Sequence, residues 1–255
     1  MNSGLRHPPP NNLTLLLNAT PGRWIEDALG SRFAHVESLV PKGYAAYARL
    51  FHPAMTQEDR RVRWATVAEW SGKVYHSLMA FEGISVPIAG HGSADRPWAD
   101  EPRAGEMDPE DIVELSRLLS DFTGTPDQYY FAVWDGYGSF SVGGSALYTP
   151  SGGISLLPAV DVENAQRIKG VAREYILFSG PPSINDFFGF PGLDGPNIWW
   201  PEDRSWSVST DIDLDSTYIG ASEECIERLI SHPSLEVLRT TSNAPVYMAA
   251  DTINL

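Results

Sequence analysis

The fold class follows from residues 108–144, which read DPEDIVELSRLLSDFTGTPDQYYFAVWDGYGSFSVGG. Asp108 is suited to cap a helix, and Pro109 is suited to its first position. Apolar residues then recur at helical spacing until Gly124, where the helix can end. These residues are Ile112, Leu115, Leu118, Leu119 and Phe122. The aromatic run from Tyr129 predicts a strand followed by a glycine turn. The segment therefore predicts an amphipathic helix and then a sheet strand.

Outside this segment, helices and strands follow one another without a regular alternation. Aromatic and β-branched residues predict strands at 33–39, 44–51, 174–180 and 235–240, and another that begins at Trp206. Ser222 is suited to cap a second helix, which would end before Pro233. Parallel βαβ units need regular alternation, so we expect an α+β fold with a mixed or mainly antiparallel sheet and packed helices.

The chain of 255 residues fits one large domain. Residues 1–12 are expected to form a flexible leader, and residues 13–255 a single α+β domain. Proline and glycine predict long loops at 87–107 and 180–205. A sub-domain boundary near 87–107 is the alternative.

The charge is strongly acidic, with 18 Lys and Arg against 33 Asp and Glu and a formal net charge of −15. The second half, from residue 129, holds 6 basic and 16 acidic residues. Nucleic acids and anionic membranes are bound mainly through basic side chains, so the composition argues against both. A basic protein is the partner that this charge favours. The sequence leaves the oligomeric state open.

Cys225 is the one cysteine, so an intrachain disulfide is excluded and a cytoplasmic location is expected. The apolar run Leu13–Leu17 is too short for a signal peptide. The six histidines, the serines and the glycine turns match no catalytic, zinc or phosphate-binding motif. We therefore assign no catalytic residue and no cofactor.

The string Asp211-Ile-Asp213-Leu-Asp215 is the candidate metal site. In a strand, alternation would send all three carboxylates to one face. Such carboxylates can bind Ca²⁺ or Mg²⁺, with Glu202 or Asp203 as a further ligand. The EF-hand pattern fails, because it requires glycine and glutamate where this chain has Ser216 and Ser222. A half-buried strand with a solvated acidic face is the simpler interpretation.

The segment 180–206 is rich in aromatic residues among prolines and glycines. It predicts either a loop packed on the core or an aromatic recognition surface. Packing is favoured, because exposure of so many large aromatics would create an aggregation-prone patch. As a hypothesis, the binding surface would comprise Trp199, Trp200, Arg204, Trp206, Asp211, Asp213 and Asp215.

Three strings resemble a family of uncharacterised proteins common in actinobacteria. They are LVPKGYAAYARLFHPA (39–54), PDQYYFAVWDGYG (126–138) and WWPEDRSWSVSTDIDLDSTYIG (199–220). The resemblance covers most of the chain and implies no reaction. A looser similarity, in size, aromatic content and acidity, is to immunity proteins of the SUKH type, which bind and neutralise toxins.

Taken together, these features predict a non-enzymatic intracellular protein that binds another protein through an acidic and aromatic surface, in an immunity-like or regulatory role. The alternative is a metal-dependent hydrolase or phosphotransferase that uses the carboxylates of residues 211–215.

Overall fold

The structure is a computed structural model that describes residues 13–92, 95–137, 146–148, 154–156, 164–182 and 195–255. The expected leader at 1–12 and a large part of the expected loop at 180–205 lie outside these residues.

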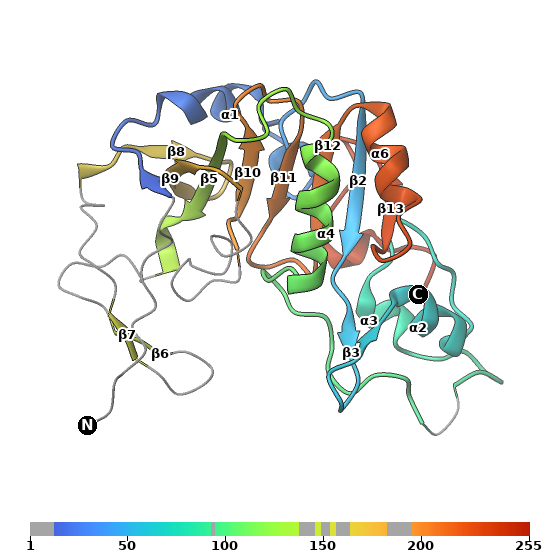
Figure 1. The fold of residues 1–255 in the computed structure, drawn as a ribbon. Coiled ribbons are helices and arrows are strands. Elements are labelled where there is room, and N and C mark those ends of the chain that lie inside the picture. Colours follow the sequence, from blue (N-terminus) through green and yellow to red (C-terminus); the bar gives the residue numbers. More distant parts are fainter. Residues whose placement is uncertain (1–12, 93–94, 138–145, 149–153, 157–163, 183–194) are drawn as a thin grey trace, which may run out of the picture.

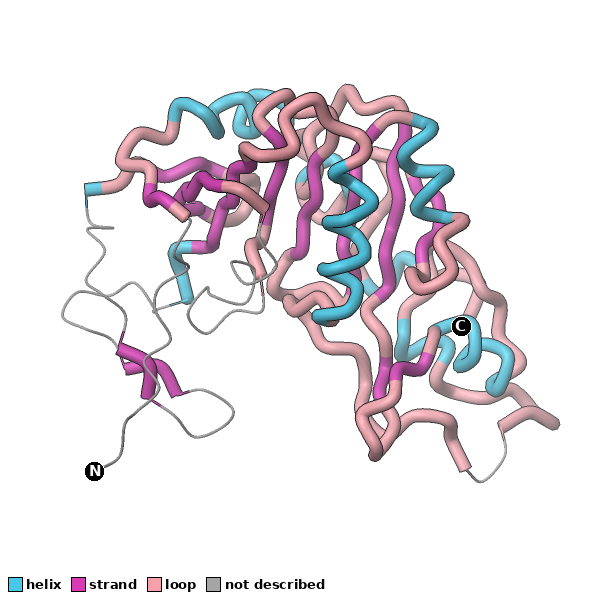
Figure 2. The backbone as a smooth tube through the Cα atoms, viewed as in Figure 1, coloured by secondary structure: helices cyan, strands magenta, loops and turns pink. Residues whose placement is uncertain are grey.

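One antiparallel sheet organises the molecule (Figures 1 and 2). Its strands follow the order β1-β9-β5-β10-β11-β12-β2-β13, and β8 pairs with β9 beside β1. The bounds are β1 Thr14–Leu15, β9 Glu174–Gly180, β5 Tyr129–Trp134, β10 Ile198–Pro201, β11 Ser207–Thr210, β12 Ser216–Ala221, β2 Ala46–Phe51, β13 Val237–Thr240 and β8 Arg167–Lys169. Two short hairpins join β3 (Ala54–Met55) with β4 (Arg61–Val62), and β6 (Ala146–Tyr148) with β7 (Ile154–Leu156).

Helices cover both faces of the sheet. The first face carries α4 (Pro109–Ser120) and α6 (Glu223–Ile230), which lie side by side in Figure 1. The second face carries α1 (Arg23–Ala28) and the short 3-10 helices η1 (Thr20–Gly22) and η2 (Val36–Ser38). Further 3-10 turns are η3 (Asp135–Tyr137) and η5 (Met248–Ala250). The α+β prediction with a mainly antiparallel sheet is confirmed.

The caps expected for the two longer helices are present. The Asp108 Oδ1 accepts a hydrogen bond from the Glu110 N–H at 3.0 Å, and the Ser222 Oγ accepts one from the Cys225 N–H at 3.2 Å. Each satisfies an amide that a helix N-terminus leaves without an intrahelical partner. The local sequence therefore sets where α4 and α6 begin.

Alternating side chains of the central strands enter two different cores. On β5, Phe131 and Val133 join the core under α4 and α6, whereas Ala132 joins the core under α1. β10 continues this pattern, with Trp199 on the first side and Trp200 on the second. Because both faces are covered, β10 is buried on both sides, and on β5 only Tyr130 and Trp134 are partly exposed.

A smaller core packs at one end of β2, around α2 (Trp64–Ser71) and α3 (Phe81–Ile84). The carboxylate of Glu236, just before β13, accepts hydrogen bonds from the Trp64 and Ala65 amides at 2.8 Å each. A residue distant in sequence therefore caps α2 and joins it to the sheet.

The long segment 87–107 is fixed to the sheet by a buried histidine. The Nδ1 of His52 lies 2.8 Å from the Arg103 carbonyl oxygen, and its Nε2 lies 3.0 Å from the Thr217 Oγ1. Burial lowers the pKa of His52 to about 4, so the ring is neutral at pH 7 and its Nδ1–H donates to the carbonyl.

Two sequence-based predictions fail. The strand expected at 33–39 is wrong, because residues 36–38 form η2, whose Val36 and Glu37 amides bond the carbonyls of Ala244 and Ser242. The loop expected at 180–205 is wrong at residues 198–201, which form the central strand β10. Nearby prolines and glycines suggested a loop, but burial of both tryptophans favours a strand.

Asp111, in the first turn of α4, is fully buried and receives a hydrogen bond from Arg61 of β4. Burial raises the pKa of Asp111 from 3.8 to about 7, although Arg61 acts in the opposite direction. Because this pKa is higher in the folded protein than in the unfolded chain, the group adds stability at low pH. That stability is lost as the pH rises through about 7.

We therefore expect Asp111→Asn to change how stability depends on pH. Between about pH 4 and pH 7, the free energy of unfolding of the wild type relative to the variant should fall by up to about 1.4 kcal/mol per pH unit. Urea unfolding at several pH values measures this difference. Asp121→Asn, at an exposed position beyond the end of α4, is the control. Parallel profiles for the wild type and Asp111→Asn would contradict the assignment.

Candidate functional site

The three predicted metal-binding carboxylates lie at a turn between β11 and β12, not in a strand. β11 ends at Thr210 and β12 begins at Ser216. The Asp211 carbonyl accepts the Leu214 N–H at 3.1 Å, and the Asp211 Oδ1 accepts the Asp213 N–H at 3.0 Å. Aspartate favours such turns because its side chain bonds the backbone two residues on. The prediction of an alternating strand at 211–215 is therefore wrong.

Two arginines already bind these carboxylates. The Nε and Nη2 of Arg173 donate to the two carboxylate oxygens of Asp211 at 3.0 Å each, and its Nη2 also donates to Asp213 at 2.6 Å. These hydrogen bonds raise the pKa of Arg173. Arg49 faces Asp215 at 3.5 Å. The three carboxylates therefore do not converge on one point.

Across the described ranges of the chain, His, Cys, Asp and Glu side chains form no group of three or more that could hold a metal ion. The hypothesis that Asp211, Asp213 and Asp215 ligate a metal, with Glu202 or Asp203 beside them, gains no support from this geometry.

We expect Arg173→Leu to destabilise the protein by about 2–3 kcal/mol, because it leaves the largely buried Asp211 carboxylate without its charged donor. Urea unfolding measures the loss. Arg60→Leu is the matched control, since Arg60 pairs with Glu58 where both side chains are exposed. That change should shift stability by no more than about 0.5 kcal/mol. Equal effects of the two variants would show that the Arg173 ion pairs add no stability.

The tryptophans of the hypothetical binding surface belong to the core. Trp199, Trp200 and Trp206 are 1%, 0% and 0% exposed. Trp206 donates its indole N–H to the Leu119 carbonyl of α4 at 2.9 Å. The prediction that these three side chains present a recognition surface is wrong, because both sides of β10 are covered and Trp206, just before β11, packs in the core under α4. Of the seven predicted surface residues, Arg204 and Asp213 are exposed and Asp211 and Asp215 partly so.

A surface of exposed acidic side chains forms where two loops meet at one end of the sheet. The Glu202 N–H donates to the Gln128 carbonyl at 2.9 Å, and the Gly124 N–H to the Asp203 Oδ2 at 2.6 Å. We call this the acidic loop surface. Its members are Asp127, Glu202 and Asp203.

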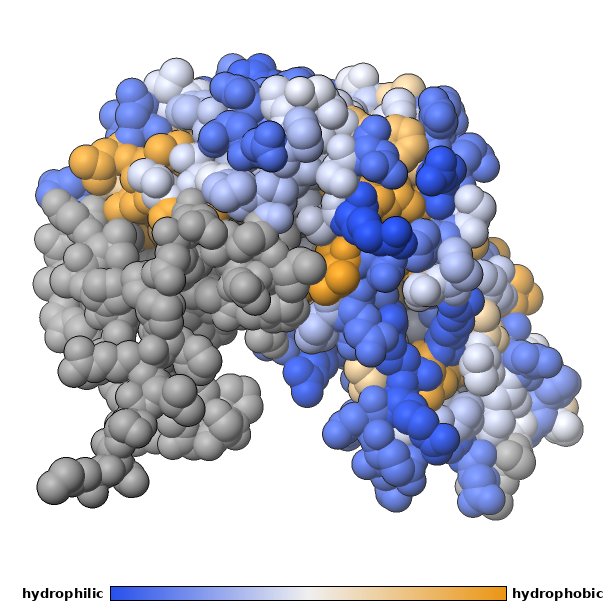
Figure 3. Space-filling model, viewed as in Figure 1, coloured by the Kyte–Doolittle hydropathy of each residue, from blue (hydrophilic) through white to orange (hydrophobic). Residues whose placement is uncertain are grey.

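Arg204 lies near the carboxylates of this surface but does not pair with them. Within the described residues, none of the three carboxylates forms an ion pair. Burial opposes ionisation of Asp203, but hydrogen bonds from the Ser205 and Gly124 amides prevail and lower its pKa. In the view of Figure 3, the described surface is largely hydrophilic, and hydrophobic side chains form only small separate groups.

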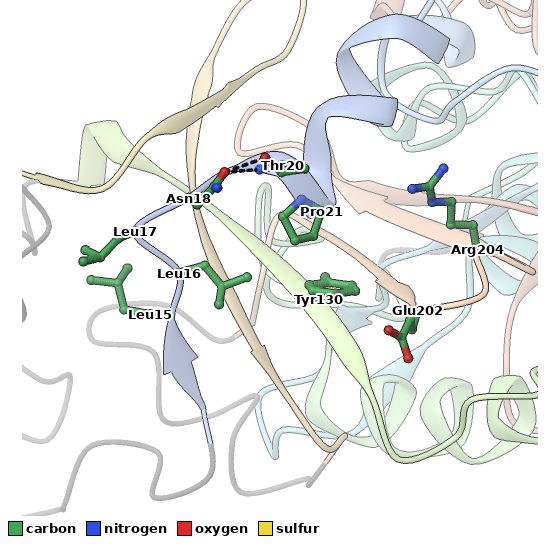
Figure 4. A pocket seen from close by; sticks show the side chains of 9 residues that line it. All are labelled: Leu15, Leu16, Leu17, Asn18, Thr20, Pro21, Tyr130, Glu202 and Arg204. Atoms are coloured by element: carbon green, nitrogen blue, oxygen red, sulfur yellow. Dashed lines mark hydrogen bonds between the residues drawn. The ribbon is translucent and has the colours of Figure 1, made fainter.

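An open groove of about 680 Å³ adjoins the acidic loop surface (Figure 4). We call it the β1 groove. The chain that follows β1 forms one side, and the ends of β5 and β10 form the other. Its lining is Leu15, Leu16, Leu17, Asn18, Thr20, Pro21, Tyr130, Glu202 and Arg204. Figure 4 shows the leucines at one end and the two charged side chains at the other.

A row of stacked side chains supports the groove from within. The Arg204 guanidinium lies 5.0 Å from the ring centre of Trp24, which meets Trp200 edge to face at 5.8 Å. Trp200 in turn stacks on Tyr130 at 5.7 Å. Both ends of this row, Arg204 and Tyr130, line the groove. The row therefore fixes the positions of a cation and an aromatic ring on its wall.

Two features of the row reduce the stability of the folded protein, and folding by itself does not require them. Arg204 has φ of 58°, a left-handed conformation that is unusual for a residue with a side chain. The indole nitrogens of Trp24 and Trp200 are buried without a hydrogen-bond partner in the described structure. Such features cluster where proteins bind ligands.

Glu202 and Arg204 both remain without an ion-pair partner in the part of the chain that the structure describes, although they lie two residues apart. The groove therefore offers one anion, one cation and an apolar wall. This combination suits a peptide segment with charged and apolar groups.

The sequence identified Arg204 but missed the rest of the groove. The run Leu13–Leu17 and the double aromatic at residues 129–130 were visible signals. They are more than 100 residues apart, and only the pairing of β1 with β9 and of β9 with β5 brings them together.

Comparison of the chain with protein-family models, with curated proteins and with solved structures gives no match. The resemblance to an actinobacterial family therefore stays a prediction. None of the helices in the described ranges has both the length and the hydrophobicity that a membrane span requires.

Proposed function

We propose that this chain is a non-enzymatic cytoplasmic protein, immunity-like or regulatory, that binds a basic partner protein. Its recognition surface would be the acidic loop surface together with the β1 groove. The observation that carries the proposal is the groove itself, in which a leucine wall meets a carboxylate and a guanidinium that form no ion pair within the described residues.

The charge distribution supports a basic partner. Arg49, Arg61 and Arg173 bind carboxylates in other parts of the fold. They are therefore not available to balance the acidic loop surface. A field of one sign attracts a partner of the opposite sign and speeds its association. The same field would repel nucleic acids and anionic membranes.

The shape and lining of the groove support a protein partner. It is open to solvent, and its lining mixes apolar, polar and charged side chains. Interfaces between proteins combine an apolar centre with a polar rim in this way. The metal-dependent hydrolase or phosphotransferase remains the alternative proposal, and no contact in the described structure favours it.

We expect a double substitution of Asp127→Lys and Glu202→Lys to abolish capture of the partner. Immobilised wild-type protein, exposed to an extract of the source organism at low salt, should retain a basic protein in stoichiometric amount. Retention should weaken about ten-fold between roughly 50 mM and 300 mM NaCl, because salt screens exposed charges.

The matched control is Glu69→Lys with Glu82→Lys, which makes the same change of net charge at exposed positions on α2 and α3. This variant should capture the partner as the wild type does. If both double variants lose capture of the partner equally, the effect reflects net charge and not the acidic loop surface. If the wild type retains no partner, the proposed function is contradicted.

A further inference from the structure

We infer that the β1 groove recognises the free C-terminal carboxylate of a peptide segment, with Arg204 as its receptor. This inference rests on the proposed function and names the part of the partner that enters the groove.

The argument begins with how Arg204 is held. The Arg204 guanidinium carbon lies over the ring of Trp24, 5.0 Å from its centre. The backbone at Arg204 is fixed separately, because its N–H donates to the Pro201 carbonyl at 2.9 Å and its carbonyl accepts the Tyr44 hydroxyl at 3.2 Å. Both ends of the side chain are therefore fixed before any ligand arrives.

The contact with Trp24 leaves the hydrogen-bonding capacity of the guanidinium available. It is a cation–π contact rather than an ion pair, so the N–H groups of Arg204 can still bind a carboxylate. Side-by-side N–H groups match the two oxygens of a carboxylate and bind them through paired hydrogen bonds. Within the described residues these donors bind no carboxylate, and Arg204 lines the groove.

The rest of the groove limits which carboxylate can bind. Leu16, Pro21 and Tyr130 supply an apolar surface for a large side chain attached close to the carboxylate. Glu202 and the acidic loop surface repel acidic segments and anionic fatty acids, and they favour a positively charged residue a short distance away. A peptide that ends in an apolar residue preceded by lysine or arginine meets these requirements. Its terminal carboxylate binds Arg204, its last side chain packs on the apolar wall, and its basic residue faces Glu202 and the acidic loop surface.

The test uses a peptide display library whose randomised segment ends at a free C-terminus. Selection on the wild-type protein should enrich peptides that end in a large apolar residue and carry lysine or arginine upstream. Each enriched peptide is then synthesised twice, as the free acid and as the amide, and its affinity is measured by fluorescence anisotropy. We expect the free acid to bind at least about ten-fold more tightly than the amide.

Variants separate the carboxylate contact from general packing. Arg204→Gln should reduce the affinity for the free acid to that for the amide and leave the amide unchanged. Arg204→Lys should restore part of the difference, because it keeps the charge without the paired donors. Leu17→Asn, on the apolar wall, should weaken both peptide forms. Arg60→Gln, at a distant exposed arginine, should change neither. Thermal unfolding of each variant confirms that it is folded.

The inference is overturned if selection enriches no peptides, if acid and amide bind equally, or if Arg204→Gln leaves their difference intact. In each case the capture experiment reports separately on the proposed function. Capture that depends on Asp127 and Glu202, with no preference for the free acid, would leave the proposed function standing and remove this inference alone.

Discussion

The burial of both faces of β10 is the constraint on which the rest of the structure depends. Trp199 and Trp200 are adjacent in sequence, so a strand must send them to opposite sides, and both are almost completely buried. Each side therefore needs its own cover. α4 and α6 supply it on the Trp199 side, and the α1 segment supplies it on the Trp200 side. The positions of these helices follow from the need to cover two large indoles.

This double burial determines what is left for recognition. Large aromatic side chains often anchor protein interfaces, but here the two cores bury them. Recognition of a partner must therefore use the edges of the sheet and the loops at the strand ends. The strand ends are also where the charge is uneven. Arg49 and Arg173 neutralise Asp215 and Asp211 at the β11–β12 turn. Near the opposite end of β11, Glu202 and Asp203 form no ion pair within the described residues, and the β1 groove adjoins them.

The sequence predicted the local elements well, because their signals are local. The cap at Asp108, the cap at Ser222 and the limits of the strand at 174–180 each depend on neighbouring residues. Prediction from the sequence failed where contacts with residues distant in sequence determine the local structure. Asp211 to Asp215 alternate as a strand would, yet Asp211 bonds the Asp213 amide in a turn, and Arg173, some 40 residues earlier, binds both carboxylates there. The candidate site was predictable only as far as Arg204, since Leu16 and Tyr130 come together through strand pairing.

Arg204 shows why the groove is more than a gap between loops. A turn that needs φ of 58° is made at lower cost by glycine, because glycine has no Cβ to clash with the backbone. An arginine here carries a conformational cost of about 1–3 kcal/mol. Its cation–π contact with Trp24 stabilises the folded state by about 0.5–2 kcal/mol. This contact therefore offsets the conformational cost but adds no net stability. The contact with Trp24 accounts for the folded structure, and among the described residues the same guanidinium has no carboxylate partner, which leaves it for a ligand.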